Sequence, residues 1–309
     1  MDRRHLLQTA SIALGATVLG SACTSGSPAD PAELPDADAD QDLFVQAASF
    51  ELLLGTGRWL AFGVTDLQNS PLDPEAEVTV HLRRIATAPD ETAEVIAGPL
   101  EAQHSPAADT GQGVYYLQTD LEEPGIIDIV VQSGGSFGTA AVQIVDPSES
   151  RVVNPADGSP VVPGAMAISA PTPTVEDDMG VFAICTQDPQ CGMHEMSLDD
   201  ALASGRPVAV VFATPQFCQT VVCGPSVANL DTLRETGEWG DTIFVHSEIF
   251  AEEPSGTDVS DTPLVPAVQA WGLPTEPWLF TIGPDGVIID RLDGPMPQPI
   301  LSALLSQLA

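Results

Sequence analysis

The sequence predicts two folded domains, an all-β sandwich followed by an α/β domain. Short apolar or alternating runs separated by turn residues fill residues 43–147, which is typical of antiparallel strands. From residue 180 onward, strand-like runs alternate with helical stretches, the order expected of an α/β domain. The length of 309 residues suits two modest domains with tails, because each domain can then bury a core of its own.

Residues 1–22 have the features of an export signal. A charged start is followed by a short apolar run from Ile12 to Leu19, and small residues precede Cys23. The apolar run is too short and too rich in small residues to span a bilayer comfortably. We therefore expect a cleaved signal peptide, with an uncleaved anchor helix as the alternative.

Two details of this leader resemble known export signals. Arg3-Arg4, followed by a pair of leucines, resembles a twin-arginine signal. Cys23 after Ala22 resembles the lipobox of bacterial lipoproteins, although Gly20 stands where those proteins usually have leucine. The resemblance implies that Cys23 is acylated and that a lipid anchors the protein to the outer, extracytoplasmic face of the cell membrane. The alternative is a soluble secreted protein in which Cys23 belongs to the leader.

The charge of the chain limits its partners. There are 44 acidic residues against nine arginines and no lysine, which gives a net charge of -35. Such a surface repels phosphate backbones, which excludes nucleic acid, and it repels anionic lipid headgroups. Residues 23–42, rich in Ser, Pro and Asp, predict a disordered acidic tether. The charge fits either solubility in high salt or an acid-rich surface without salt adaptation.

The first domain, residues 43–147, is expected to be an immunoglobulin-like antiparallel sandwich. Its strand-like runs lie at 59–64, 78–82, 114–117, 126–131 and 140–145. No catalytic group stands out, since we expect His81 on a strand surface and His104 in a loop. Residues 148–179, rich in Pro, Ser and Gly, predict a linker that wraps or bridges the domains.

The second domain, residues 180–309, has the predicted element order β-α-β-α-β-β-α after a first short helix. We expect strands at 207–212, 243–249, 278–282 and 287–289, and helices at 197–203, from 223 onward, at 263–271 and at 300–308. The first strand is continuously apolar, as a buried central strand requires. Asp285-Gly286 predicts a hairpin turn between the last two strands.

The sequence around the cysteines resembles the thioredoxin superfamily over roughly residues 180–309. Two motifs carry the resemblance: Val-Val-Phe-Ala-Thr-Pro-x-Phe-Cys218-x4-Cys223-Gly-Pro, and Trp-Gly-Leu-Pro-Thr-Glu-Pro277-Trp before the hairpin. They are similar to those of the thioredoxin-domain lipoproteins of bacteria. The resemblance implies a thioredoxin-like fold in which a cis proline, Pro277, faces the cysteines; Pro274 is the alternative position.

Four residues separate Cys218 from Cys223, whereas thioredoxins have two residues between their cysteines. Two residues five apart in one α-helix are separated by about 7.5 Å along its axis, and a disulfide needs Cα atoms within about 7 Å. The two cysteines can therefore pair only if one lies outside regular helix. We expect Cys218 in the loop after the strand and Cys223 near the helix start, where Pro225 suits the first turn.

This pair predicts a thiol–disulfide oxidoreductase that acts on extracytoplasmic protein thiols or disulfides and uses no cofactor. A helix N-terminus stabilises a thiolate. The more accessible Cys218 is expected to attack a partner, and Cys223 to resolve the mixed disulfide. The resemblance implies that Pro277 helps to bind the backbone of the partner. The alternative is a permanent Cys218–Cys223 disulfide, which exported proteins use freely.

Cys185 and Cys191 are predicted to form a structural disulfide. The five cysteines resolve naturally as one modified residue, Cys23, and two pairs. The segment between Cys185 and Cys191 is loop-like and lies before the predicted central strand, which favours a structural role. A second redox-active pair is the alternative.

Three other functions remain open. A peroxidase would combine the Cys218 thiolate with an arginine, for which Arg291 is the candidate. A copper-handling protein would use the soft and imidazole ligands Met193, His194 and His246 beside the cysteines, although we predict no resident metal. A binding or scaffold lipoprotein would use the thioredoxin-like fold without chemistry.

Overall fold

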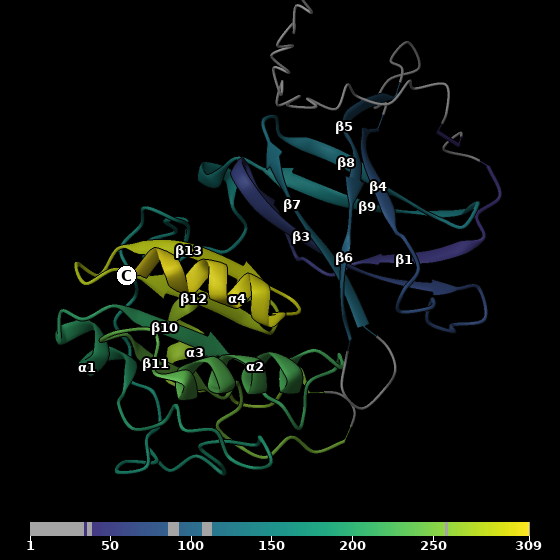
Figure 1. Cartoon of the computed structure of the whole chain (residues 1–309). Helices are drawn as coiled ribbons and strands as arrows, with labels where there is room; N and C mark the ends of the chain where they lie inside the picture. The colour runs from purple at the N-terminus through teal and green to yellow at the C-terminus, as the bar shows by residue number, and fades with distance from the viewer. Residues whose placement is uncertain (1–33, 36–38, 86–92, 107–112, 257–258, 309) are drawn as a thin grey trace, which may run out of the picture.

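The computed structural model describes residues 34–35, 39–85, 93–106, 113–256 and 259–308 (Figure 1). The predicted signal peptide and Cys23 lie outside these residues, as does most of the predicted tether. The described chain is mainly β structure, with three sheets and four α-helices. None of the helices in this part of the chain is long and apolar enough to cross a membrane.

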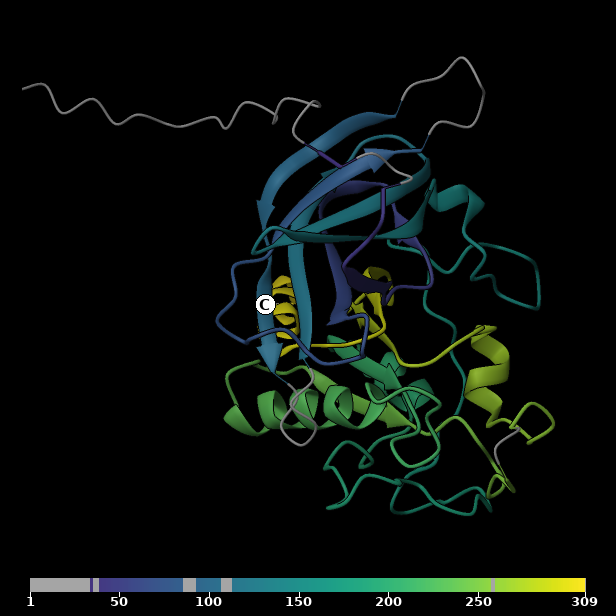
Figure 2. The same ribbon diagram turned by 90° about the vertical axis from the view of Figure 1, so that its right-hand side faces the viewer.

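Two of the described sheets face each other and form the N-terminal domain (Figures 1 and 2). One has the strand order β1-β3-β7-β6 and the other β2-β9-β8-β4-β5. Their strands are β1 Leu43–Ala47, β2 Leu52–Leu53, β3 Gly55–Asp66, β4 Thr79–Arg84, β5 Glu94–Glu101, β6 Gln103–Pro106, β7 Gly113–Leu121, β8 Gly125–Ser133 and β9 Ser136–Val145. Buried residues of both sheets, among them Leu60, Phe62, Leu82 and Ile129, form one apolar core. This arrangement is compatible with the predicted β-sandwich.

The five strand-like runs of the sequence overlap β3, β4, β7, β8 and β9, and only Val78 falls outside its strand. The expected surface position of His81 in β4 is wrong, because its side chain is only 4% exposed. Gly98 of the neighbouring strand β5 lies over the imidazole, and a Cβ atom at this glycine would come within 2.7 Å of the ring. The expected loop position of His104 is also wrong: it lies in β6, with its ring centroid 4.7 Å from that of Tyr115.

The third sheet belongs to the C-terminal domain and has the order β11-β10-β12-β13. Its strands are β10 Val208–Phe212, β11 Ile243–Ser247, β12 Trp278–Ile282 and β13 Ile288–Asp293. β10 is buried along its whole length, and it pairs in parallel with β11 and antiparallel with β12. The β12–β13 hairpin turns at Gly286, whose φ of 80° favours glycine. The four predicted strands are therefore confirmed, and β13 is longer than expected.

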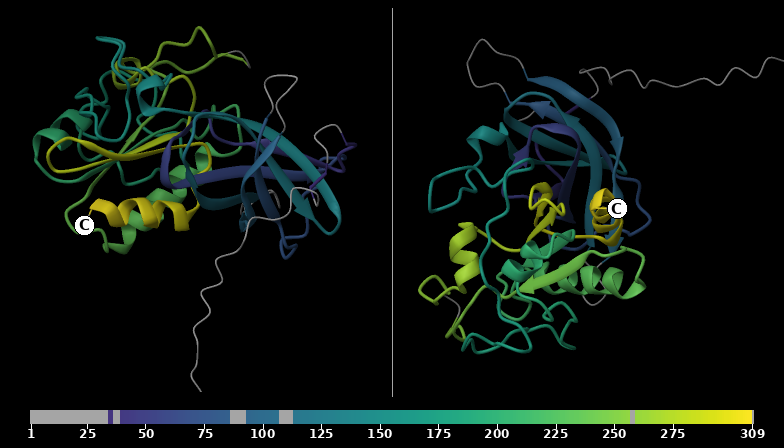
Figure 3. Two further views of the ribbon diagram at one scale, coloured as in Figure 1. Left: turned by 90° about the horizontal axis from the view of Figure 1, so that it is seen from above. Right: turned by 90° about the vertical axis from the view of Figure 1, so that its left-hand side faces the viewer.

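Helices cover both faces of this sheet. In the described chain they are α1 Leu198–Ala203, α2 Cys223–Thr236, α3 Pro266–Trp271 and α4 Gln298–Leu305. Because side chains alternate along β10, Val208, Val210 and Phe212 pack with α1 and α3. Ala209 and Val211 pack with α2 and α4, which lie side by side on the same face (Figure 3).

Residues 151–197 connect the two domains with isolated β-bridges but without a helix or a longer strand. Most of the predicted linker lies within them. The segment runs along the outer side of the C-terminal domain (Figure 2). It is packed, since Val152, Val161 and Ala170 join the apolar core that contains α1 and α3. A segment of this length without backbone ladders depends on other contacts to hold its shape.

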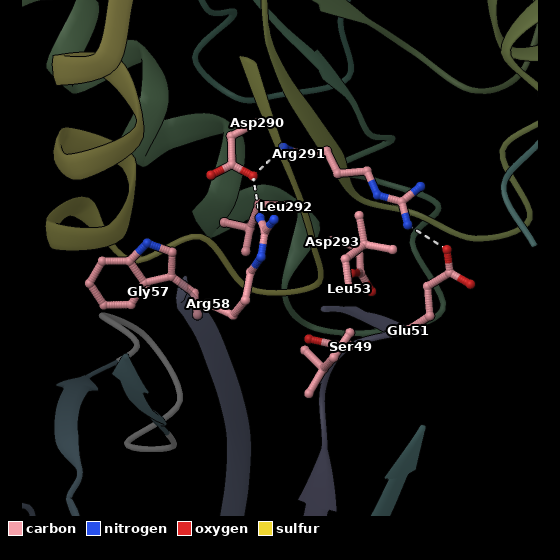
Figure 4. Close-up of a pocket in the computed structure, with 11 residues that line it drawn as sticks. Ser49, Glu51, Leu53, Gly57, Arg58, Asp290, Arg291, Leu292 and Asp293 are labelled. Atoms are coloured by element: carbon pink, nitrogen blue, oxygen red, sulfur yellow. Dashed lines mark hydrogen bonds and ion pairs between the residues drawn. The ribbon is translucent and has the colours of Figure 1, made fainter. Parts of the chain in front are cut away.

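A buried polar cluster joins the two domains beside a pocket (Figure 4). The fully buried carboxylate of Glu51 accepts hydrogen bonds from Arg291 of β13 and from Ser150 Oγ, the latter at 2.5 Å. Arg151 N–H donates a third, at 3.1 Å. Burial alone would raise the pKa of Glu51, but these hydrogen bonds and the charge of Arg291 bring it below its usual value. The carboxylate is therefore ionised at neutral pH and binds groups from both domains.

We expect Arg291→Met to lower the free energy of unfolding by about 3–5 kcal/mol at neutral pH, because it leaves the Glu51 carboxylate buried without its counter-charge. Chemical denaturation measures the change. The matched control is Arg84→Met, since Arg84 pairs with Glu123, whose side chain is 70% exposed, and loss of such a pair costs at most about 1 kcal/mol. Equal losses in the two variants would contradict the role assigned to Glu51.

Asp293 at the same junction predicts a pH dependence of stability. It is buried and accepts a hydrogen bond from Phe50 N–H. Burial raises its pKa to about 7, whereas an unfolded aspartate has a pKa of ~3.9. Between these values the folded chain keeps a proton that the unfolded chain has lost, so stability is lost as the pH rises through this window.

We expect Asp293→Asn to remove up to about 1.4 kcal/mol per pH unit of this dependence. Asparagine keeps an oxygen that accepts the Phe50 N–H but carries no charge. Denaturation of both proteins across a pH series between the two pKa values measures the difference. Parallel stability curves would show that Asp293 does not titrate as assigned.

Candidate functional site: two neighbouring sulfur clusters

The first cluster lies where the chain leaves β10 and reaches α2. Cys218 lies in the connecting loop, and Cys223 is the first residue of α2. The two form a disulfide with 6.1 Å between their Cα atoms. This confirms the expectation that one cysteine lies outside regular helix, and Pro225 lies in the first helical turn. Cys223 is fully buried, whereas Cys218 is partly exposed.

A cis peptide bond joins Glu276 to Pro277 directly before β12. The cis proline therefore lies at the expected position, directly before the strand that pairs with β10. The Glu276 carboxylate and the sulfurs of Cys218 and Cys223 lie within 4.8 Å of one another. Thr214 N–H donates a hydrogen bond of 2.5 Å to Glu276, which holds the carboxyl group beside the disulfide.

Glu276 is a residue of this site that the sequence did not single out. Burial raises its pKa to about 7; the hydrogen bond from Thr214 N–H opposes the rise, and the negative charge of Glu248 adds to it. A carboxyl group with this pKa can both donate and accept a proton near neutral pH. Its only sequence signal is the Glu-Pro pair before an apolar strand, because its burial depends on the pairing of β12 with β10.

Accessible apolar side chains lie in the loop that carries Cys218 and in the segment packed on that loop. Val221, in the loop between the two cysteines, is 67% exposed. Phe217 precedes Cys218 and packs edge to face on Phe182, with 5.7 Å between the ring centroids. Phe182 is itself partly accessible. The loop that carries Cys218 therefore presents accessible apolar surface as well as a partly exposed cysteine.

The second cluster corrects a prediction. Cys185 and Cys191 are free thiols, so the predicted disulfide between them is wrong. Their sulfurs are 3.7 Å apart, whereas an S–S bond is about 2.05 Å long. Two imidazoles approach the same sulfurs: His194 Nε2 and His246 Nδ1 each lie 3.3 Å from the Cys191 sulfur, and His246 Nδ1 lies 3.8 Å from the Cys185 sulfur.

The four side chains of this second cluster are all buried. His246 comes from β11, and its Nε2–H donates a hydrogen bond of 2.9 Å to Ala213 O, which leaves Nδ1 facing the sulfurs. Hydrogen bonds from Cys191 and from the two histidines hold the pKa of Cys185 well below its usual value, although burial acts in the opposite direction. Met193, the third metal candidate of the sequence, lies in the apolar core. Its backbone carbonyl accepts a hydrogen bond from the backbone N–H of His246.

Comparisons with known proteins assign no family. No protein-family model matches the chain, and no curated protein matches its sequence. Among solved structures, the ZirS C-terminal domain is 10% identical with a TM-score of 0.19, over 47% of this chain and 87% of that one. A β-glucosidase from Listeria innocua is 16% identical with a TM-score of 0.20, over 33% of this chain and 15% of that one. The PKD domain of the human VPS10 domain-containing receptor SorCS2 is 15% identical with a TM-score of 0.18, over 45% of this chain and 99% of that one. Likenesses of this size carry no functional assignment.

Proposed function

We propose that the chain is an exported, lipid-anchored protein whose C-terminal domain has a thioredoxin-like fold and exchanges disulfides with extracytoplasmic proteins. Three features support this fold. β10, α2 and β11 form a parallel β-α-β unit, an antiparallel hairpin and α4 follow it, and a cis proline precedes β12. For the sandwich we propose an immunoglobulin-like topology and a role as a spacer or docking module. The anchor at Cys23 rests on the leader sequence.

The observation that carries the redox proposal is the asymmetry of the Cys218–Cys223 disulfide. Cys218 is partly exposed, whereas Cys223 is buried at the first turn of α2. Thiol–disulfide exchange needs one sulfur that can be attacked and another that leaves as a thiolate. The unpaired N–H groups of the first helical turn stabilise the leaving Cys223 thiolate.

In the direction that oxidises a partner, the exchange has two steps. A partner thiolate attacks Cys218, forms a mixed disulfide and displaces Cys223 as a thiolate, which protonated Glu276 then protonates. The second partner thiolate attacks the partner sulfur of the mixed disulfide and releases Cys218. The partner dithiol has become a disulfide, and the protons of its two thiols return through Glu276 and water to the Cys218 and Cys223 thiols. The reverse steps reduce a partner disulfide.

A protein segment fits this site better than a small thiol. The exposed Val221 and Phe182 offer apolar contact beside Cys218, and such contact favours an unfolded or partly folded chain as partner. We propose that Pro277, whose cis peptide bond precedes β12, helps to bind the backbone of that segment.

The peroxidase alternative requires an arginine beside the thiolate. The candidate, Arg291, instead forms an ion pair with Glu51 at the domain junction. It also lies over the Trp278 ring, 5.2 Å from the ring centroid. Its guanidinium is therefore bound to a carboxylate and is not offered to a peroxide at Cys218.

We expect Cys223→Ser to accumulate a stable mixed disulfide with a peptide disulfide, because Cys218 attacks and no thiol is left to resolve the product. Mass spectrometry without reductant identifies the linked cysteine. The matched control, Cys218→Ser, should trap little, since Cys223 is buried. Equal trapping by the two variants, or a reduction potential of the wild-type pair below about −300 mV, would instead favour a permanent structural disulfide.

We expect Glu276→Gln to slow the exchange by about 10²-fold at pH 7, because the leaving Cys223 thiolate loses its proton donor. In the wild type, the rate at a fixed concentration of attacking thiolate should fall as the pH rises past about 7, where Glu276 loses its proton. Stopped-flow kinetics across a pH series measures both effects. The control Glu238→Gln changes an exposed carboxyl group of the same domain. A pH profile of Glu276→Gln identical to that of the wild type would remove Glu276 from the mechanism.

A further inference from the structure

Cys185, Cys191, His194 and His246 converge on one point inside the C-terminal domain. Their nearest donor atoms all lie within 4.8 Å of one another. Around a tetrahedral zinc ion, with Zn–S bonds of about 2.3 Å and Zn–N bonds of about 2.0 Å, two sulfurs lie about 3.8 Å apart and sulfur lies about 3.5 Å from nitrogen. The observed distances of 3.7 Å between the sulfurs, and of 3.3, 3.3 and 3.8 Å from sulfur to nitrogen, match these edges.

The surroundings of His246 are those of a metal ligand. A ligating imidazole usually donates its other N–H to a carbonyl or carboxylate, which fixes the ring and its tautomer. His246 Nε2 lies 2.9 Å from Ala213 O and 3.9 Å from Glu248 Oε1. Glu248 is held in turn by the N–H and Oγ1 of Thr186, at 2.5 and 2.9 Å. Because Thr186 directly follows Cys185, the contacts of Glu248 connect the ligand Cys185 to the ligand His246.

We propose that these four side chains bind a structural zinc ion through two thiolates and two imidazoles. All four are buried, so the site is closed, with no position open to a substrate. A closed tetrahedral set of two sulfurs and two nitrogens is typical of structural zinc. The cluster is distinct from the Cys218–Cys223 disulfide, and the proposal does not depend on thiol–disulfide exchange.

The proposed zinc ion joins two different parts of the C-terminal domain. Cys185, Cys191 and His194 belong to the irregular segment 151–197, whereas His246 belongs to β11. A shared ion therefore cross-links a segment without helix or strand to the central sheet. Binding of a structural zinc contributes directly to folding, because its ligands are brought together only in the folded chain.

The test is the metal content of the full chain, purified without reductant from cells supplied with zinc and freed of loose ions by gel filtration. We expect inductively coupled plasma mass spectrometry to find about one zinc ion per chain. Cys185→Ser and His246→Gln should bind zinc at least tenfold more weakly (~10-fold is already typical for loss of an outer-layer partner). The matched control, Cys218→Ser/Cys223→Ser, removes the other two described cysteines and should keep its zinc.

A second measurement covers variants that fail to fold. Wild-type chain loaded with Co²⁺ in place of zinc should show the visible absorption of tetrahedral cobalt and thiolate-to-cobalt charge transfer, and the control should show the same spectrum. A folded wild type without zinc, a Cys185–Cys191 disulfide in most chains, or stoichiometric copper in place of zinc would each overturn the proposal. Failure of peptide exchange at Cys218 leaves the zinc content unchanged, so the two proposals fail separately.

Discussion

The peptide group between Ala213 and Thr214 holds both sulfur clusters in place. Its carbonyl accepts the Nε2–H of His246, and its N–H donates to Glu276. β10, which ends just before this group, is buried and lies between β11 and β12. His246 belongs to β11, and Glu276 lies directly before β12. The order of the strands therefore decides which side chains meet at the cysteines, and a different neighbour on either side of β10 would dismantle one cluster.

The sandwich supports this end of the sheet from outside. Phe50 packs edge to face on Trp278, the residue after the cis proline, with 6.4 Å between the ring centroids. Gly294 N–H donates a hydrogen bond to Pro277 O, and the adjacent Asp293 accepts the Phe50 N–H. The β-rich N-terminal domain therefore contacts the segment that carries the cis bond, in addition to any role as a spacer. Because Glu51 and Arg291 join the same two regions, the junction combines apolar packing with a buried ion pair, and its polar groups have partners on both sides.

Local sequence patterns predicted the strands and helices of the C-terminal domain, because a continuous apolar run and an Asp-Gly turn each depend on neighbouring residues alone. They also predicted that Cys218 and Cys223 can pair, because the Cα distance that a disulfide allows depends only on the short segment between the two cysteines. They did not predict the burial of His81, which depends on a glycine in another strand, or the position of Glu276 beside the disulfide. The predicted Cys185–Cys191 disulfide was wrong for a related reason. Cysteine counting paired Cys185 with Cys191. The sequence did offer His194 and His246 as metal ligands, but it did not show which cysteines they approach, because that depends on the placement of β11.

The planarity of the amide between Ala213 and Thr214 has a consequence for how the two clusters respond to each other. Partial double-bond character keeps its oxygen and hydrogen in one rigid plane, so neither end can swing without the other. When Glu276 gains or loses its proton, the pull on the N–H changes, and the amide carries that change to the imidazole at its far end. The zinc ion proposed at that imidazole would resist rotation of the plane, and it would thereby keep the Glu276 carboxyl group aligned with the cysteines during the proposed exchange.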